Sequence, residues 1–253
     1  MSSTYILTSY ILNNIPCIFV KYGDGELFAA NYSSGGNCDG TPYTCNLGDK
    51  VRESFIYLSK QPNVMLGVWH DSSASKFWQG LVDYKLNWVN YHTVIIDSLD
   101  SPDKLMLFKA IKESSRKKIY IANPLLKRAI PLLNIDLHVE VDYSNWFDTS
   151  YDSVFSKVRD AVVSDSNTII MTSAGMGAKY LISDLHKLYP NAIFIDIGCA
   201  LDTICTKRDS RGFNIEYEAL VKHLQDIIPE NWESPEYINI FIDAQNRLGK
   251  HLR

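Results

Sequence analysis

The sequence predicts an α/β protein in which a mostly parallel sheet is covered by helices on both faces. Two observations support this class. Nearly continuous apolar runs recur along the chain, which is typical of strands buried on both faces. Segments of helical length separate these runs, as parallel connections require. A chain of 253 residues can bury a substantial core, and we expect one domain over residues 1–253.

The expected elements alternate from the first apolar run onward. The predicted strands are Cys17–Tyr22, Asn63–Trp69, His92–Ile96, Lys118–Ala122, Leu137–Val141, Thr168–Thr172 and Ala192–Ile197. The predicted helices are Tyr5–Leu12, Leu47–Leu58, Ser75–Tyr84, a segment from the Asp100-Ser-Pro cap to about Ser114, a short one ending near Leu133, Tyr151–Val163, Lys179–Leu188, Glu216–Ile228 and Pro235–Leu248. The last two lie in a C-terminal part, about 214–253, that we expect to close the sheet.

The helices follow from apolar residues at helical spacing and from local stop signals. The first one ends at Asn13-Asn14, just before Pro16, and Leu27 begins a further candidate. Asn31–Thr44 is rich in Gly, Ser, Asn and Thr and shows no period, so it is predicted to be a long loop. Loops of that length in compact domains are usually functional or mobile.

Composition and charge exclude some classes of partner. A net charge of −4 provides no electrostatic reason to expect nucleic acid or an anionic membrane surface as a partner. The five cysteines form no CxxC pair, and neither a signal peptide nor an apolar run of transmembrane length is present. We therefore expect a reduced, cytoplasmic protein without a membrane span, with a homo-oligomer left open.

Polar residues cluster where the predicted strands end. These positions are Gly23–Glu26, His70-Asp71, Asn123, Ser173–Gly177 and Asp196–Gly198. In open parallel sheets, ligands bind beyond the carboxyl ends of the strands. The fold prediction therefore places one candidate site at this edge of the sheet.

The segment Gly23-Asp24-Gly25-Glu26 is the first candidate site. In an extended segment the side chains of Asp24 and Glu26 would point to the same side, which suits a divalent cation. Mg²⁺ and Mn²⁺ take oxygen ligands and often share them with substrate phosphates. Gly23 and Gly25 would permit close approach of a bulky anion. The alternative interpretation is a tight turn with two solvated acids, since Gly and Asp are common in turns.

The segment Ser173-Ala-Gly-Met-Gly177 is the second candidate site. It follows a predicted strand and opens a helix, so its small residues Ser173 and Gly175, with Met176 and Gly177, could present backbone N–H groups to a phosphate. It matches neither GxGxxG nor the Walker A pattern. The alternative is a strand-to-helix turn in which glycine is needed only for packing.

Further polar residues follow the last predicted strand. Asp196 could bind a sugar hydroxyl or cap the sheet edge, and Arg208 and Arg211, in a basic loop, could neutralise a diphosphate or stay solvated. His70 and Asp71 are a weaker pair, because the other histidines lack ligand spacing. Asp71, His70 and Asp196 remain equal candidates for a general base.

Three segments in order resemble the GT-D glycosyltransferase family. They are Val20-Lys-Tyr-Gly-Asp-Gly-Glu26, Thr172-Ser-Ala-Gly-Met-Gly-Ala-Lys-Tyr-Leu-Ile-Ser-Asp-Leu185 and Ile195-Asp-Ile-Gly198. Family members have a motif similar to (R/K)-aromatic-GDGE near the N-terminus. Near the C-terminus they have a small-residue turn, a helix with the pattern LxxDL and then a strand ending in DIG. The resemblance covers roughly residues 15 to 215.

The resemblance implies a Rossmann-like fold and a metal-dependent transferase that uses a nucleotide sugar, commonly a UDP-sugar. Asp24 and Glu26 match the DxE element, which implies that they bind Mn²⁺ or Mg²⁺ and the donor diphosphate. Lys21 and Tyr22 match the (R/K)-aromatic pair before it, although the family usually has Arg at the first position. Many members have His where this chain has Cys199. The implied acceptor is a glycan or a glycoprotein.

Two other functions fit the same residues. A metal-dependent phosphohydrolase of a phosphorylated small molecule would use the same acids. A non-catalytic module that binds a nucleotide or a glycan would use the same pocket without turnover. Release of phosphate or free sugar without an acceptor distinguishes the first from a transferase, and donor binding without product distinguishes the second.

Overall fold

The described part of the chain forms a seven-stranded sheet in which every strand pair is parallel. The computed structural model describes residues 2–37, 40–69, 72–96, 101–142, 144–162, 164–208 and 216–248. The strands are β1 (Cys17–Tyr22), β2 (Val64–Val68), β3 (Trp88–Asn90), β4 (Lys117–Ala122), β5 (Leu137–Glu140), β6 (Thr168–Ser173) and β7 (Ile193–Asp196). Their order is β3-β2-β1-β7-β6-β4-β5. The predicted α/β class is confirmed.

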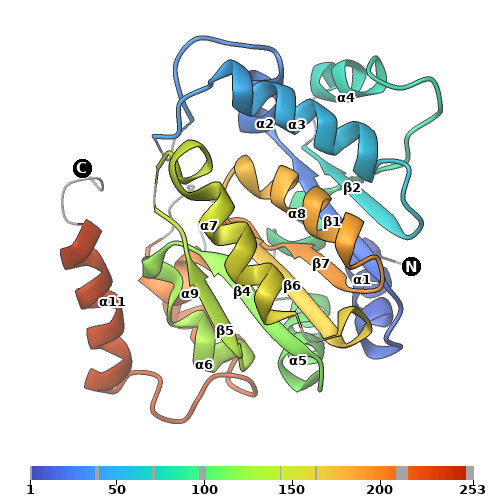
Figure 1. Cartoon of the computed structure of the whole chain (residues 1–253). Coiled ribbons are helices and arrows are strands. Elements are labelled where there is room, and N and C mark those ends of the chain that lie inside the picture. The colour runs from blue at the N-terminus through green and yellow to red at the C-terminus, as the bar shows by residue number, and fades with distance from the viewer. Residues whose placement is uncertain are drawn as a thin grey trace.

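The helices cover both faces of this sheet (Figure 1). They are α1 (Ser3–Leu12), α2 (Asp24–Ala30), α3 (Cys45–Leu58), α4 (Ser72–Gln79), α5 (Pro102–Glu113), α6 (Ala129–Leu133), α7 (Trp146–Ala161), α8 (Gly177–Leu188), α9 (Asp202–Thr206), α10 (Tyr217–His223) and α11 (Pro235–Leu248). A 3₁₀ turn, η2 (Pro124–Leu126), follows β4, and another, η3 (Asp165–Asn167), precedes β6. Apolar side chains of α2, α3, α4, α7 and α8 form the core on one face, and those of α1, α5, α6, α9 and α10 form it on the other.

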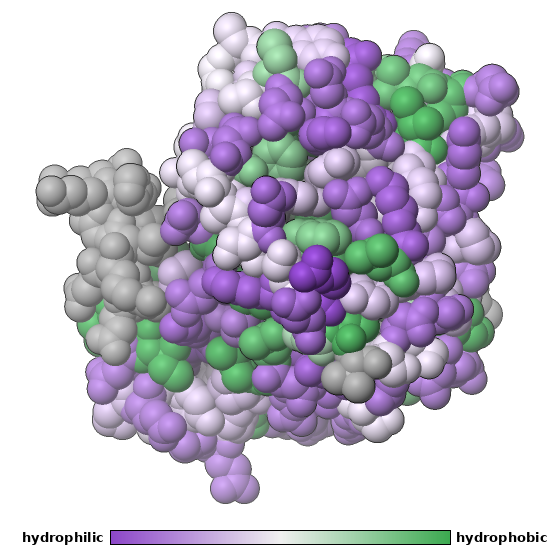
Figure 2. Space-filling view, in the orientation of Figure 1, coloured by the Kyte–Doolittle hydropathy of each residue, from purple (hydrophilic) through white to green (hydrophobic). Residues whose placement is uncertain are grey.

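Burial on both faces explains the apolar composition of the central strands. All six residues of β1 are buried, and five of the six residues of β4 and of β6 are. On the face shown in Figure 2, hydrophilic residues predominate and apolar ones form separate small groups. The apolar sides of the covering helices therefore face the sheet. Among the described residues, no helix is long and apolar enough to cross a membrane.

The prediction of the third strand was wrong, and α4, α7 and α10 begin or end several residues away from their predicted bounds. The segment His92–Ile96, predicted as a strand, forms a π-helical turn, and the strand lies earlier, at Trp88–Asn90. Val94, Ile95 and Ile96 are at most 2% exposed, because this turn packs into the core. The preference of β-branched residues for strands depends on their packing context. In this segment, packing into the core overrides that local preference. The short helix α9 after β7 was not predicted.

The chain leaves β1 and its neighbour β7 toward opposite faces of the sheet. After β1 it enters α2, whose Ala29 and Ala30 join one core, and after β7 it enters α9, whose Ile204 and Cys205 join the other. The two carboxyl ends are therefore separated by a crevice at a topological switch point, the usual location of ligand sites in open parallel sheets.

Candidate functional site

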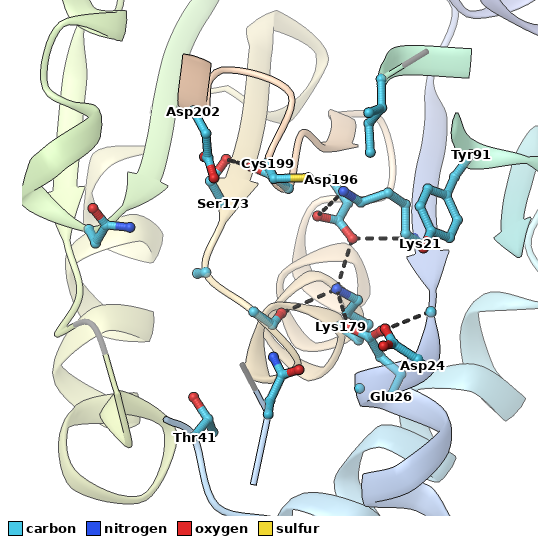
Figure 3. Close-up of a pocket in the computed structure, with 18 of the residues that line it drawn as sticks. Lys21, Asp24, Glu26, Thr41, Tyr91, Ser173, Lys179, Asp196, Cys199 and Asp202 are labelled. Atoms are coloured by element: carbon cyan, nitrogen blue, oxygen red, sulfur yellow. Dashed lines mark hydrogen bonds and ion pairs between the residues drawn. The ribbon is translucent and has the colours of Figure 1, made fainter. Parts of the chain in front are cut away.

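A cavity of about 350 Å³ lies at this crevice, as predicted from the strand ends. Its walls come from the ends of β1, β4, β6 and β7, from α2, from the loop before α3 and from the turn after β3. Figure 3 shows the polar side chains of several of these segments pointing toward one another. The residues that line it include Lys21, Gly23, Asp24, Gly25, Glu26, Asn123, Ser173, Gly175, Lys179, Asp196, Gly198, Cys199 and Asp202.

The two acids of the first motif do not lie in an extended segment, so that expectation was wrong. Asp24 is the first residue of α2, and Glu26 lies two residues later in the same helical turn. Residues two apart on a helix do not share a face. Asp24 is exposed, whereas Glu26 is 8% exposed and its Oε2 accepts a hydrogen bond from the backbone N–H of Gly23 at 2.8 Å. Glu26 therefore caps α2 from within.

A buried ion network joins Glu26 to the last strand. The ammonium of Lys179, on α8, lies 2.6 Å from Oε1 of Glu26 and 2.9 Å from Oδ2 of Asp196. Lys21 Nζ lies 3.8 Å from the other carboxylate oxygen of Asp196, and the backbone N–H of Lys21 donates to Asp196 Oδ2 at 3.2 Å. Two buried ammonium groups thus balance two buried carboxylates.

The network decides the charge state of its members. Burial alone raises the pKa of Asp196, but the charges of Lys179 and Lys21 outweigh it and hold that pKa below its ordinary value. Burial lowers the pKa of Lys179, whereas Asp196 and Glu26 raise it further, so the net shift is upward. Asp196 is thus a charged anchor for both lysines and a weak base, although it was one of the general-base candidates.

The segment after β6 is divided between the cavity and the core. Ser173 and Gly175 line the cavity; the Ser173 hydroxyl donates to the carbonyl of Gly198 at 2.6 Å, and Gly175 has a φ of +62°. Met176 is 1% exposed and is a core residue. A Cβ on Gly177 would lie 2.8 Å from Cδ2 of Phe147, so glycine there is a packing requirement. Only the first part of the predicted phosphate segment borders the cavity.

Several other predicted site residues lie elsewhere. Tyr22 is fully buried among the aromatic rings of Phe55 and Trp78 and does not line the cavity. Arg208 is exposed and is likewise absent from the lining. His70, Asp71 and Arg211 lie outside the described residues.

Other lining residues had no assigned role in the sequence. Tyr91 and Asn37 explain the two glycines of the first motif: a Cβ on Gly23 would lie 3.1 Å from the Tyr91 hydroxyl, and one on Gly25 would lie 3.0 Å from Oδ1 of Asn37. Tyr91 precedes the mispredicted turn, and Asn37 lies in a loop without period, so no local signal pointed to either. Lys179 had a positional signal, because it opens the predicted helix directly after the small-residue turn Ser173–Gly177.

The carboxylates that line the cavity are the groups that could bind a divalent cation. No group of three or more His, Cys, Asp or Glu among the described residues could hold a metal by itself. Mg²⁺, however, is usually bound by one or two carboxylates together with substrate phosphates and water. Asp24 is an exposed carboxylate on the cavity wall and fits that shared mode, whereas both oxygens of Glu26 already have partners.

The fold is shared with solved structures. One, described as the highly conserved domain of unknown function 1792 with a distinct glycosyltransferase fold, aligns with a TM-score of 0.55 and 16% identity over 77% of this chain and 76% of that one. Another, described as a new glycosyltransferase (DUF1792) from Streptococcus sanguinis, aligns with a TM-score of 0.54 and 16% identity over 78% and 80%. This chain has the DUF1792 glycosyltransferase fold.

Comparisons of sequence alone find no match. No family model matches this chain, and no curated protein matches it. A selenomethionine form of the DUF1792 domain aligns with a TM-score of 0.53 at 15% identity over 78% of this chain. At such identities the likeness establishes the DUF1792 fold alone.

Proposed function

We propose that this protein is a glycosyltransferase that moves a sugar from a nucleotide-sugar donor to a glycan or glycoprotein acceptor. The observation that carries the proposal is the cavity at the β1/β7 crevice, where Asp24, Ser173 and Gly175 face one space. A nucleotide-sugar donor needs such a site for its diphosphate, and the DUF1792 fold supports this class of reaction.

The charges of the lining support a role for a divalent cation. Among the described residues, two lysines, Lys21 and Lys179, stand against five carboxylates, Asp24, Glu26, Asp142, Asp196 and Asp202. A dianionic diphosphate would be repelled by this surplus unless a cation entered with it. We propose Mn²⁺ or Mg²⁺, held by Asp24 together with the donor. Such an ion supplies stabilisation of the charge that develops on the leaving diphosphate.

The chain's own groups would orient the donor around that charge. In the turn before α8, Ser173, Ala174 and Gly175 line the cavity and would contact the phosphate oxygens of the donor. Lys21 lines the cavity with its ammonium 5.6 Å from the ring centroid of Tyr91, which adds a positive charge to the cavity wall. These groups would bind and orient the diphosphate, and a UDP-sugar is the first donor to examine.

The test is titration of the protein with UDP and UDP-sugars in the presence and absence of Mn²⁺, by calorimetry and by product analysis with glycan acceptors. We expect UDP to bind more tightly with Mn²⁺ than without it, and sugar transfer to require an acceptor. Phosphate or free sugar released at full rate without any acceptor would instead identify a phosphohydrolase. Tight UDP-sugar binding with no product in any acceptor screen would identify a binding module.

A further inference from the structure

The ammonium of Lys179 has no hydrogen-bonding capacity left for a substrate. Besides the contacts to Glu26 and Asp196, it donates to the carbonyl of Gly175 at 3.2 Å. A lysine ammonium has three N–H donors, so these three acceptors saturate it. Its side chain is 4% exposed. Lys179 therefore acts on the cavity through its partners.

Those three partners belong to three separate segments of the chain. Glu26 lies on α2 after β1, Gly175 lies in the turn after β6, and Asp196 ends β7. Each segment contributes to the cavity wall, and each is one of the polar strand ends that the sequence predicted to lie at the site. Figure 3 shows Lys179 between Glu26 and Asp196, with a dashed line to each. The Lys179 side chain thus holds these three segments of the cavity wall at fixed distances from one another.

The same contacts separate the roles of the two acids in the first motif. The oxygens of Glu26 are divided between Lys179 Nζ and the backbone N–H of Gly23, and its side chain is 10% exposed. Asp24, at the start of the same helix, is exposed on the cavity wall. The pair is therefore one buried structural carboxylate and one solvent-facing carboxylate.

We propose that Lys179 is a positioning residue that holds Glu26, Gly175 and Asp196 in place, and that Asp24 alone of the two motif acids meets the cation and diphosphate of the donor. This inference rests on the proposed function for its ligand. Removing Asp24 removes a ligand, whereas neutralising Glu26 loosens an anchor. The two acids therefore differ in what their loss changes.

The first experiment compares Asp24→Asn with Glu26→Gln in Mn²⁺ binding, measured by electron paramagnetic resonance in the presence of saturating UDP. We expect Asp24→Asn to weaken Mn²⁺ binding by about tenfold or more, equivalent to about 1.4 kcal/mol, and Glu26→Gln to change it by about threefold or less. Equal losses in the two variants would overturn the inference, because they would make Glu26 a ligand as well.

The second experiment examines Lys179 with Lys179→Met, Glu26→Gln and the double variant. Lys187, an exposed lysine on the same helix that pairs with Asp184, provides the matched control Lys187→Met. We expect Lys179→Met to weaken UDP–Mn²⁺ binding, the double variant to be no weaker than Lys179→Met alone, and Lys187→Met to bind as the wild type does. Additive losses would contradict a shared role for Lys179 and Glu26.

The two proposals fail separately. If the wild-type protein binds no UDP with Mn²⁺ present, the proposed donor is wrong. The tie between Lys179 and Glu26 is then tested by denaturant unfolding of the same four variants, where coupling of the two substitutions is expected in the free energy of unfolding. Absence of that coupling would overturn the positioning role. If Lys179→Met does not fold, the comparison of Asp24→Asn with Glu26→Gln still decides the assignment of the acids.

Discussion

Single residues determine how the side chains of the cavity are placed, and Gly198 is an example. It has a φ of +58°, and a Cβ built on it would lie 1.6 Å from Nζ of Lys21. The Lys21 side chain therefore passes across the position that any other residue would fill. In the sequence, Gly198 was only the glycine of the DIG strand end. Its role in making room for a buried lysine became visible from the fold.

The first prediction concerns Gly198→Ala. We expect it to destabilise the protein by about 1–3 kcal/mol, because it adds a left-handed backbone strain and displaces Lys21 from Asp196. Denaturant unfolding measures this loss. Gly35→Ala is the matched control, since Gly35 also has a positive φ, of +102°, but nothing lies within 4 Å of its Cβ position. A loss at Gly198 no larger than at Gly35 would show that the contact with Lys21 is unimportant.

The second prediction concerns cysteine reactivity. Burial raises the pKa of the Cys17 thiol to about 12, and burial also raises that of Cys205. Thiolate is the reactive form, so both should resist alkylation of the native protein at neutral pH. Cys45 is exposed and should react before Cys17 and Cys205. Mass spectrometry after brief iodoacetamide treatment gives the order, and labelling of Cys17 as fast as Cys45 would contradict the burial.

At the scale of elements, the ion network fastens four of them together. Lys21 is the penultimate residue of β1, Glu26 lies in the first turn of α2, Lys179 lies on α8, and Asp196 ends β7. A buried ion pair adds little net stability over an apolar pair, but removing one partner leaves the other charge uncompensated. Lys179→Met should therefore cost about 3–5 kcal/mol in the free energy of unfolding.

The third prediction is a pH dependence of stability that Asp196 causes. Its pKa is lower in the folded protein than the ordinary value of 3.8, so it contributes stability that is present above that value and is lost as the pH falls through the folded pKa. Urea unfolding from pH 7 down to pH 2 measures the slope. Asp196→Asn should be less stable at pH 7 and should lose less stability on acidification. Parallel curves for the two proteins would contradict the linkage.

For the whole molecule, a buried arginine holds the segment before α11 against the sheet layers. Arg128 is 1% exposed, and its guanidinium donates a hydrogen bond to the backbone carbonyl of Trp232 at 3.0 Å. The same guanidinium lies 4.1 Å from the centroid of the Trp232 ring. Glu233 pairs with Arg128 at 3.6 Å and also with Lys207. Arg128, between η2 and α6, thus ties this segment to the rest of the fold, together with the buried side chains of Leu220, Leu224 and Ile227.

The fourth prediction concerns Arg128→Ala. We expect a loss on the order of 3 kcal/mol, since hydrogen bonds to a charged group are each worth about 1.5–3 kcal/mol. We also expect faster hydrogen exchange over residues 216–234, measured by mass spectrometry. Arg159→Ala is the control, because Arg159 is exposed and forms its ion pair with the neighbouring residue Asp160. Equal exchange in both variants would mean that other contacts hold this segment.

Much of the fold could be predicted because its signals are local. The apolar runs of β1, β4 and β6 are buried on both faces, so their composition alone identifies them. The run His92–Ile96 has the same composition but is buried in a π-helical turn, and no local signal separates the two cases. Where the strands end also follows from sequence, and parallel pairing brings those ends to one edge. The cavity was therefore found at the expected place.

The sequence by itself determined the α/β class, the edge of the sheet that carries the site and three of the segments that line it, because each depends on composition and chain order. Only the tertiary structure decided what each side chain does there. Asp24 and Glu26 look equivalent in Gly-Asp-Gly-Glu, yet the start of α2 turns one outward and Lys179, 153 residues later, engages the other. Charge pairing across such a separation depends on packing that no local pattern records.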